Sequence, residues 1–142
     1  MSEYIVPNVW TWENEAEEIK NLGGNRPTAG SRFEQTLPVG EADLQLYSLG
    51  TPNGIKITIL LEELKDLGVS ETEYDLFLIH IGNGDQFGSD FVKINPNSKI
   101  PALVDQSQEP ALNVFESGSI LLYLAEKFGH LIPKDIHGRT ET

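Results

Sequence analysis

The chain has 142 residues, of which 39% are hydrophobic, and a formal net charge of −12. This length suits one compact domain with an additional segment, and the acidic surface argues against nucleic acid or an acidic membrane as a partner. The chain contains no cysteine, which excludes a disulfide scaffold and a Cys-x-x-Cys redox motif, so any thiol chemistry must come from a ligand.

Nothing in the sequence indicates export or membrane insertion. The first residues, Met1 to Tyr4, lack the basic and apolar stretches of a secretory signal. The longest aliphatic run, Ile57 to Leu61, is interrupted by Thr58 and is far too short to span a bilayer. We therefore expect a soluble, cytoplasmic protein.

Residues 1–42 are rich in glycine and proline and show no long periodic pattern. This composition predicts an extended N-terminal arm, with one short helix near Glu13–Lys20. Trp10 and Trp12 lie in this arm, and the simplest interpretation is that they attach it to the domain rather than contact a ligand.

The next segments predict a βαβ unit. Residues 44–48 alternate as a short strand, and the sequence Thr51-Pro52-Asn53-Gly54 is typical of a turn. Four apolar residues then recur at helical spacing, and Gly68 provides a stop; they are Ile57, Leu60, Leu61 and Leu64. A second strand over 74–79 follows, which we expect to pair in parallel with the first.

The second half of the domain predicts a ββα unit. Residues 82–89 are expected to form a loop, and residues 90–94 a short helix. Strands are expected over 100–104 and 112–115, paired antiparallel because their connection is short. Leu121, Leu124, Ala125 and Phe128 predict a helix closed by Gly129. The whole is an α/β fold of thioredoxin-like type, a four-stranded mixed sheet with flanking helices over residues 43–130.

Three segments match the motifs of a known superfamily, and the chain resembles the glutathione-binding half of a bacterial nu-class glutathione transferase. This class is related to the yeast nitrogen regulator that can form a prion. The matching segments are 46–54 (Leu-Tyr-Ser-Leu-Gly-Thr-Pro-Asn-Gly), 95–103 (Asn-Pro-Asn-Ser-Lys-Ile-Pro-Ala-Leu) and 115–120 (Phe-Glu-Ser-Gly-Ser-Ile). The segments 82–87 and 25–27 are similar to the nu class in particular.

The resemblance also implies a domain organisation. Family members continue into an all-helical domain, which supplies the wall for the second substrate and much of a homodimer interface. Residues 131–142 are therefore interpreted as the linker into a helical domain that this chain does not include. A fragment without that domain is one alternative to an active enzyme, because half of the catalytic cleft would be absent.

Glu116 and Ser117 lie where a predicted strand ends and a helix begins. Backbone N–H groups at a helix N-terminus attract a carboxylate, and Ser117 can cap the helix and bond the ligand. The Glu116 carboxylate can pair with an ammonium group. From spacing alone a plain helix cap with an exposed acid is the simpler interpretation; the resemblance implies that both residues bind glutathione.

Ile100-Pro101 precedes a predicted strand. Composition favours a trans peptide bond, because only about 5–6% of X-Pro bonds in folded proteins are cis. The resemblance implies a cis bond, which would turn the Ile100 backbone toward the cysteinyl backbone of glutathione. Lys99 and Gln86 are candidates for binding the glycyl carboxylate, although Lys99 could equally be a solvated surface charge.

Thr51 and Asn53 are the predicted catalytic residues. A hydroxyl and an amide at a helix N-terminus can hydrogen-bond a bound thiolate and lower the pKa of the thiol. We expect the thiolate of glutathione to be the nucleophile, with Pro52 also contacting the ligand. The alternative that Thr51 and Asn53 cap the helix is compatible with this role.

Asn25 is a further candidate, because in the nu class the arm folds over the site and a second glutathione can bind beside the first. Two thiols in one pocket suit disulfide exchange. His80, His130 and His137 are dispersed and suggest no metal site.

The expected function is glutathione-dependent thiol chemistry on a small electrophile or a disulfide: glutathione transfer, disulfide-bond reduction or hydroperoxide reduction. The alternative is a non-catalytic glutathione-binding or regulatory module that works through protein contacts.

Overall fold

The computed structural model describes residues 8–9 and 30–142. Its centre is a four-stranded mixed sheet with the strand order β2-β1-β3-β4. β1 (Leu44–Ser48) and β2 (Tyr74–Leu78) are parallel, β3 (Ala102–Asp105) is antiparallel to β1, and β4 (Leu112–Phe115) is antiparallel to β3. The predicted thioredoxin-like β-α-β and β-β-α order is therefore confirmed.

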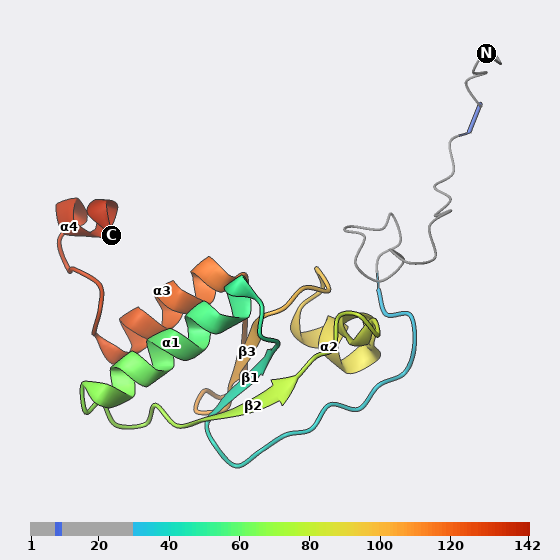
Figure 1. Cartoon of the computed structure of the whole chain (residues 1–142), viewed down its shortest axis with the longest axis horizontal. Helices are drawn as coiled ribbons and strands as arrows, with labels where there is room; N and C mark the ends of the chain where they lie inside the picture. The colour runs from blue at the N-terminus through green and yellow to red at the C-terminus, as the bar shows by residue number, and fades with distance from the viewer. Residues whose placement is uncertain (1–7, 10–29) are drawn as a thin grey trace.

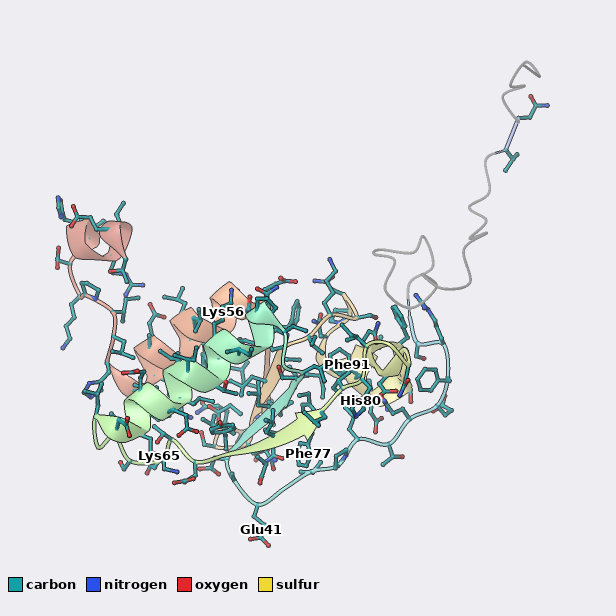
Figure 2. The ribbon with its side chains drawn as sticks, viewed as in Figure 1. Glu41, Lys56, Lys65, Phe77, His80 and Phe91 are labelled. Atoms are coloured by element: carbon teal, nitrogen blue, oxygen red, sulfur yellow. The ribbon has the colours of Figure 1, made fainter. Side chains whose placement is uncertain are left out.

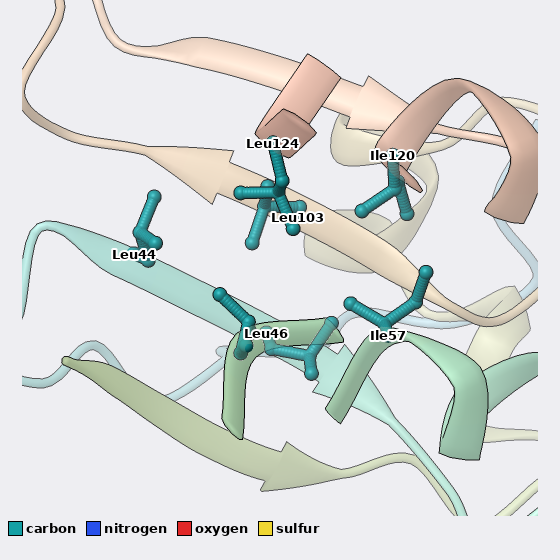
Figure 3. Close-up of a cluster of buried hydrophobic side chains, with 7 residues drawn as sticks. Leu44, Leu46, Ile57, Leu103, Ile120 and Leu124 are labelled. Carbon is teal, nitrogen blue, oxygen red and sulfur yellow. The ribbon is translucent and has the colours of Figure 1, made fainter. Parts of the chain in front are cut away.

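Two helices lie side by side on one face of the sheet (Figure 1). α1 (Pro52–Asp66) connects the two parallel strands, and α3 (Ser117–Phe128) follows β4. Their apolar faces meet the sheet in a cluster of seven buried side chains (Figure 3), formed by Leu44, Leu46, Ile57, Leu61, Leu103, Ile120 and Leu124. The helical spacing recognised in the sequence thus marks the face of α1 that is removed from water.

The other face of the sheet carries a second core. α2 (Ser89–Ile94) contributes Phe91, which is fully buried and packs with Tyr47, Ile79 and Ala102. Phe77 packs against this cluster from β2 and stacks on Tyr47 with ring centroids 5.4 Å apart (Figure 2 labels Phe77 and Phe91). Because strand side chains alternate, β1 supplies residues to both cores and all five of its residues are buried.

Three local predictions are corrected by the structure. Residues 52–54 form the first turn of α1 and Thr51 is its N-cap, so residues 51–54 are not a separate turn. The expected loop over 82–89 contains the 3₁₀ helix η2 (Asp85–Phe87), and α2 already begins at Ser89. Gly84 adopts a φ of 84°, a left-handed conformation that glycine tolerates, and this turn leads directly into η2.

Residues 30–42 are called here the docked arm; residues 32–37 contact η2 and α2, and residues 38–42 contact β1 and β2. Phe33 forms an isolated parallel bridge with Gly88, and the Ser89 N–H donates to the Phe33 carbonyl at 2.9 Å. The Tyr47 hydroxyl donates to the Pro38 carbonyl at 2.8 Å. This part of the predicted arm is therefore attached to the domain, whereas Trp10, Trp12 and the helix expected near Glu13–Lys20 lie outside the described residues.

A polar cluster joins the carboxyl end of β3 to α3. Asp105 is completely buried and accepts hydrogen bonds from Tyr123 (2.6 Å), Ser107 (2.6 Å) and Lys127. Burial raises the pKa of Asp105, but the bonds from Lys127, Ser107 and Tyr123 outweigh it and hold that pKa below its usual range. Conversely, burial and the neighbouring Asp105 raise the pKa of the Tyr123 hydroxyl.

The chain ends in a short helix, α4 (Ile136–Glu141), within the segment that the sequence suggests is a linker. Asp135 caps α4 by accepting from the Gly138 N–H at 2.9 Å, and Arg139 pairs with Glu126 of α3 at 2.6 Å. Among the helices of residues 8–9 and 30–142, none is sufficiently long and apolar to cross a membrane.

Candidate functional site

The sheet register brings the predicted site residues to one edge. Tyr47 of β1 pairs with Ala102 of β3, and Ala102 pairs with Phe115 of β4. The carboxyl ends of β1 and β4 therefore meet the amino end of β3. Both α1 and α3 begin directly after these strand ends, so two helix N-termini and the segment before β3 share this edge.

Thr51 is the N-cap residue of α1. Its extended backbone (φ −97°, ψ 161°) lets Oγ1 accept a hydrogen bond from the Gly54 N–H at 3.2 Å. Pro52 occupies the first turn of the helix, where its missing N–H costs nothing. The capping interpretation of Thr51 is thus confirmed, and its hydroxyl still carries an O–H group that could serve a ligand.

Gly54 explains why α1 can begin so close to β1. A Cβ atom at this position would lie 2.1 Å from the Leu49 carbonyl oxygen and 2.5 Å from Ser48 Oγ. Only a residue without a side chain fits this approach, and the close approach holds Thr51 at the end of the strand. Asn53, in the same turn, is exposed.

Glu116 has an unusual backbone conformation between β4 and α3. Its φ of 66° lies in the left-handed region that residues other than glycine rarely occupy. Such strained residues persist where the surrounding structure holds them, and they are frequent at functional sites. The Glu116 side chain is exposed, and its Oε1 accepts a hydrogen bond from Asn97 Nδ2 at 3.1 Å.

Ser117 does not cap α3, which corrects the prediction for this residue. Glu116 occupies the N-cap position, with no side-chain capping bond, and Ser117 is the first helical residue. The Ser117 hydroxyl instead donates to Asn53 Oδ1 of α1 at 3.5 Å. The starts of the two helices are therefore connected by a long hydrogen bond.

The loop before β3 contains a cis peptide bond between Ile100 and Pro101. This is the isomer that the family resemblance implies, and the trans bond that composition favours is wrong. Pro101 is buried, and Ile100 packs against the second core. β3 begins at Ala102 rather than at Ile100, so both residues precede the ladder and lie at the shared edge.

The two candidates for the glycyl carboxylate occupy different environments. Gln86 lies in η2 and is only 5% exposed, whereas Lys99 is exposed. The docked arm holds η2 in place, since the Arg32 N–H donates to the Phe87 carbonyl at 2.8 Å and the Arg32 guanidinium lies 3.1 Å above the Phe87 ring. Asn25 lies outside the described residues.

Two asparagines that were not predicted as site residues hold this loop together. Asn95 is 1% exposed; its Nδ2 donates to the Lys99 carbonyl at 2.6 Å, and its Oδ1 accepts from the Asn97 N–H at 2.9 Å. Asn97 in turn bonds Glu116. The available signal was the Asn-Pro-Asn sequence itself, because asparagine side chains often bond backbone groups two residues on.

Metal ligation finds no support in the part of the chain that the structure describes. Among residues 8–9 and 30–142, no group of three or more histidine or acidic side chains could hold a metal ion. The sheet edge presents hydroxyl, amide and carboxylate side chains together with two helix N-termini, an arrangement suited to a ligand that carries both anionic groups and an ammonium group.

Comparison with known proteins identifies the family of this chain. Residues 42–126 match the family model of the glutathione S-transferase N-terminal domain. The disulfide-bond oxidoreductase YghU of Escherichia coli is 60% identical over 144 residues, covering 98% of this chain and 48% of that protein. This chain thus spans about half the length of this curated relative.

Solved structures agree. The glutathione transferase YghU from Streptococcus pneumoniae, complexed with glutathione, has a TM-score of 0.89 and 59% identity, covering 98% of this chain and 53% of that one. A glutathione transferase from Burkholderia graminis, with two glutathione molecules bound per subunit, has a TM-score of 0.59 and 46% identity. The match covers 69% of this chain and 39% of that one. With its thioredoxin-like sheet and the matching family model, this chain belongs to the glutathione S-transferase family as an N-terminal domain.

Proposed function

We propose that this chain is the glutathione-binding half of an enzyme of glutathione-dependent thiol chemistry. The reaction class is glutathione transfer or disulfide-bond reduction, with hydroperoxide reduction as a lesser activity. The names of the relatives support this proposal, since one is a disulfide-bond oxidoreductase and another is a glutathione transferase with glutathione bound. Bound glutathione is the cosubstrate, and the other substrate is a small electrophile or a disulfide.

The γ-glutamyl end of glutathione binds at the start of α3. Its carboxylate accepts bonds from Ser117 and the free N–H groups of the first turn, where the helix dipole favours an anion. Its ammonium pairs with the Glu116 carboxylate, which is exposed and accessible to a ligand. The Ile100 backbone pairs with the cysteinyl residue, and Lys99 and Gln86 serve the glycyl carboxylate.

The thiol of glutathione lies at the start of α1, near Pro52. Thr51 and Asn53 donate hydrogen bonds to the thiolate, and the helix dipole adds a favourable field. Hydrogen bonds to the charged form lower the pKa of a thiol, so a larger fraction is ionised at neutral pH. Because the chain has no cysteine, the nucleophile is supplied by the ligand.

Two glutathione molecules complete the disulfide reaction. The first thiolate attacks one sulfur of the substrate R–S–S–R′, forming a mixed disulfide and releasing R′S⁻, which takes up a proton. The second glutathione thiolate attacks the mixed disulfide at the glutathione sulfur, forming glutathione disulfide and releasing RS⁻. The structure from Burkholderia graminis, with two glutathiones per subunit, supports this stoichiometry, and Asn25 is the candidate contact to the second molecule.

The full-length enzyme is further proposed to be a cytoplasmic homodimer. Residues 1–142 contain no cysteine, so they need no oxidising compartment to form a disulfide. Sedimentation of the full-length protein tests the dimer, and a single species at the monomer mass would contradict it.

The observation that carries the proposed function is the convergence of Thr51, the Ile100-Pro101 loop and Glu116-Ser117 on one edge of the sheet. Calorimetric titration of reduced and oxidised glutathione into the full-length protein tests it. We expect saturable binding that is lost in Glu116→Ala/Ser117→Ala and kept in the control Glu63→Ala, an exposed acid on α1. Binding of neither form by the wild type would overturn the proposal, and one glutathione per subunit would contradict the two-molecule reaction.

A further inference from the structure

The loop over residues 95–99 joins the cis-proline segment to Glu116, and the proposed function assigns no task to its asparagines. We propose that Asn97 is a positioning residue, which holds the Glu116 carboxylate in the orientation that receives the ammonium group of glutathione. This inference rests on the proposed function, because it concerns how the same site recognises the γ-glutamyl end.

The contact is specific and joins residues 19 positions apart. Asn97 Nδ2 lies 3.1 Å from Glu116 Oε1. The donor occupies one carboxylate oxygen and leaves the other oxygen for a second partner. Since Asn97 is uncharged, the carboxylate keeps its full negative charge and its attraction for an ammonium group. A lysine or arginine at this position would instead compete with the ligand for the carboxylate.

The loop is held so that Asn97 can perform this task. Its own N–H donates to Oδ1 of the buried Asn95 at 2.9 Å, and the Ser98 N–H donates to the Asn95 carbonyl at 3.0 Å. Nδ2 of Asn95 anchors the other end of the loop at the Lys99 carbonyl. Ser98 adopts a φ of 53°, which tightens the turn between these contacts.

Glu116 benefits from such support because its side chain is exposed and would otherwise sample several rotamers. Its backbone is already fixed in an uncommon conformation, and the bond from Asn97 fixes its carboxylate as well. Ordering this side chain before the ligand arrives removes part of the entropy cost of binding. The affinity gain should therefore depend on the ligand's ammonium group and on nothing else in glutathione.

The test uses full-length protein and two probes, glutathione and its analogue that lacks the α-amino group, glutaryl-cysteinyl-glycine. In Asn97→Ala we expect about a tenfold loss of affinity for glutathione and no change for the analogue. The isosteric variant Asn97→Asp should lose at least as much affinity for glutathione as Asn97→Ala, because it replaces the hydrogen-bond donor to Glu116 with a second negative charge. The matched control is Asn113→Ala, another exposed amide, located on β4.

Coupling to Glu116 separates positioning from a general effect on the fold. In Asn97→Ala/Glu116→Gln we expect the same glutathione affinity as in Glu116→Gln alone. The decisive quantity is the ratio of the affinity for glutathione to the affinity for the analogue. If this ratio were the same in wild type and in Asn97→Ala, the inference would be overturned and the proposed function would remain intact. Failure of wild-type protein to bind either probe would overturn the proposed function itself. Thermal unfolding of each variant verifies that it is folded.

Discussion

The hydroxyl of Ser117, the first residue of α3, lies 3.5 Å from Asn53 Oδ1 in the first turn of α1, although 64 positions separate the two residues. The positive ends of two helix dipoles therefore meet at one point of the sheet edge. One helix start holds a hydroxyl and an amide suited to a thiolate, and the other holds a carboxylate and a hydroxyl suited to an amino acid. This separation of tasks matches the two ends of the γ-glutamyl-cysteinyl unit.

The first prediction concerns the two residues proposed to stabilise the thiolate. Thr51→Ala/Asn53→Ala in the full-length enzyme should lower kcat by about 10- to 100-fold, because two hydrogen bonds to the thiolate are lost. Thr51→Ser should keep most of the activity, since it retains both the hydroxyl and the cap. Steady-state kinetics with a disulfide substrate measure the effect, and unchanged turnover in the double variant would mean that the catalytic assignment is wrong.

The second prediction follows from the backbone of Glu116. With φ at 66°, Glu116→Gly should be more stable to urea than Glu116→Ala by about 1 kcal/mol, because glycine adopts positive φ without strain. Both variants remove the carboxylate, so the comparison isolates the backbone. Equal urea midpoints for the two would indicate that this conformation costs nothing.

The third prediction concerns two glycines in the two long helices. Gly54→Ala should destabilise the domain by about 2 kcal/mol or more, because the added Cβ meets the Leu49 carbonyl oxygen at 2.1 Å. Gly118→Ala is the control. A Cβ added at Gly118 meets nothing within 4 Å, apart from its chain neighbours and the backbone of its own helix. Alanine also has a higher helix propensity than glycine. Urea unfolding monitored by circular dichroism compares them; a Gly54→Ala variant as stable as wild type would refute the close approach.

The fourth prediction concerns the buried carboxylate of Asp105. Lys127→Met should cost about 3 kcal/mol of stability at pH 7, because it leaves a buried carboxylate without its cationic partner. Lys65→Met provides the control, since it breaks only the exposed pair with Glu73 and should have a much smaller effect. A loss no larger in Lys127→Met than in Lys65→Met would contradict the assigned importance of the buried pair.

Asp105 also sets a pH dependence. Because the folded protein lowers the pKa of this carboxyl, its contribution to stability is present above the unfolded pKa of about 3.9 and is lost as the pH falls through the lower folded value. Asp105→Asn should therefore be less stable at neutral pH and lose less stability than wild type on acidification. Urea unfolding at a series of acidic pH values measures this. An equal fall in the free energy of unfolding of the two proteins on acidification would contradict the expectation.

The sequence predicted the elements whose signal is local. The spacing of Ile57, Leu61 and Leu64 identified the buried face of α1, and the family motifs led to the correct family. Thr51 was recognised as a possible cap because a threonine before a proline and a helical pattern is a local signature. Such features depend on neighbours within a few residues, which a single sequence displays directly.

The remaining features depend on contacts between distant segments. Ser117 was expected to cap α3, but Glu116 occupies the N-cap position with a φ of 66°, which no residue preference indicates, and Ser117 is the first helical residue. The partner of Asn97 could not be predicted either, because Glu116 reaches it only once β3 and β4 have paired. Composition and the family resemblance disagreed on the isomer of Ile100-Pro101; the bond is cis, as the resemblance implies, and composition pointed the other way because local statistics favour trans whatever the surrounding fold.

The ionisation of bound glutathione provides the most direct test of the central claim. The ultraviolet absorbance of the thiolate is followed against pH in full-length protein saturated with glutathione, for wild type and for Thr51→Ala/Asn53→Ala. A wild-type thiol pKa well below the value of about 8.5 for a free cysteine thiol, and a return toward that value in the double variant, are the predicted result. A bound thiol that titrates as it does in free solution would contradict the claim that this helix start activates glutathione.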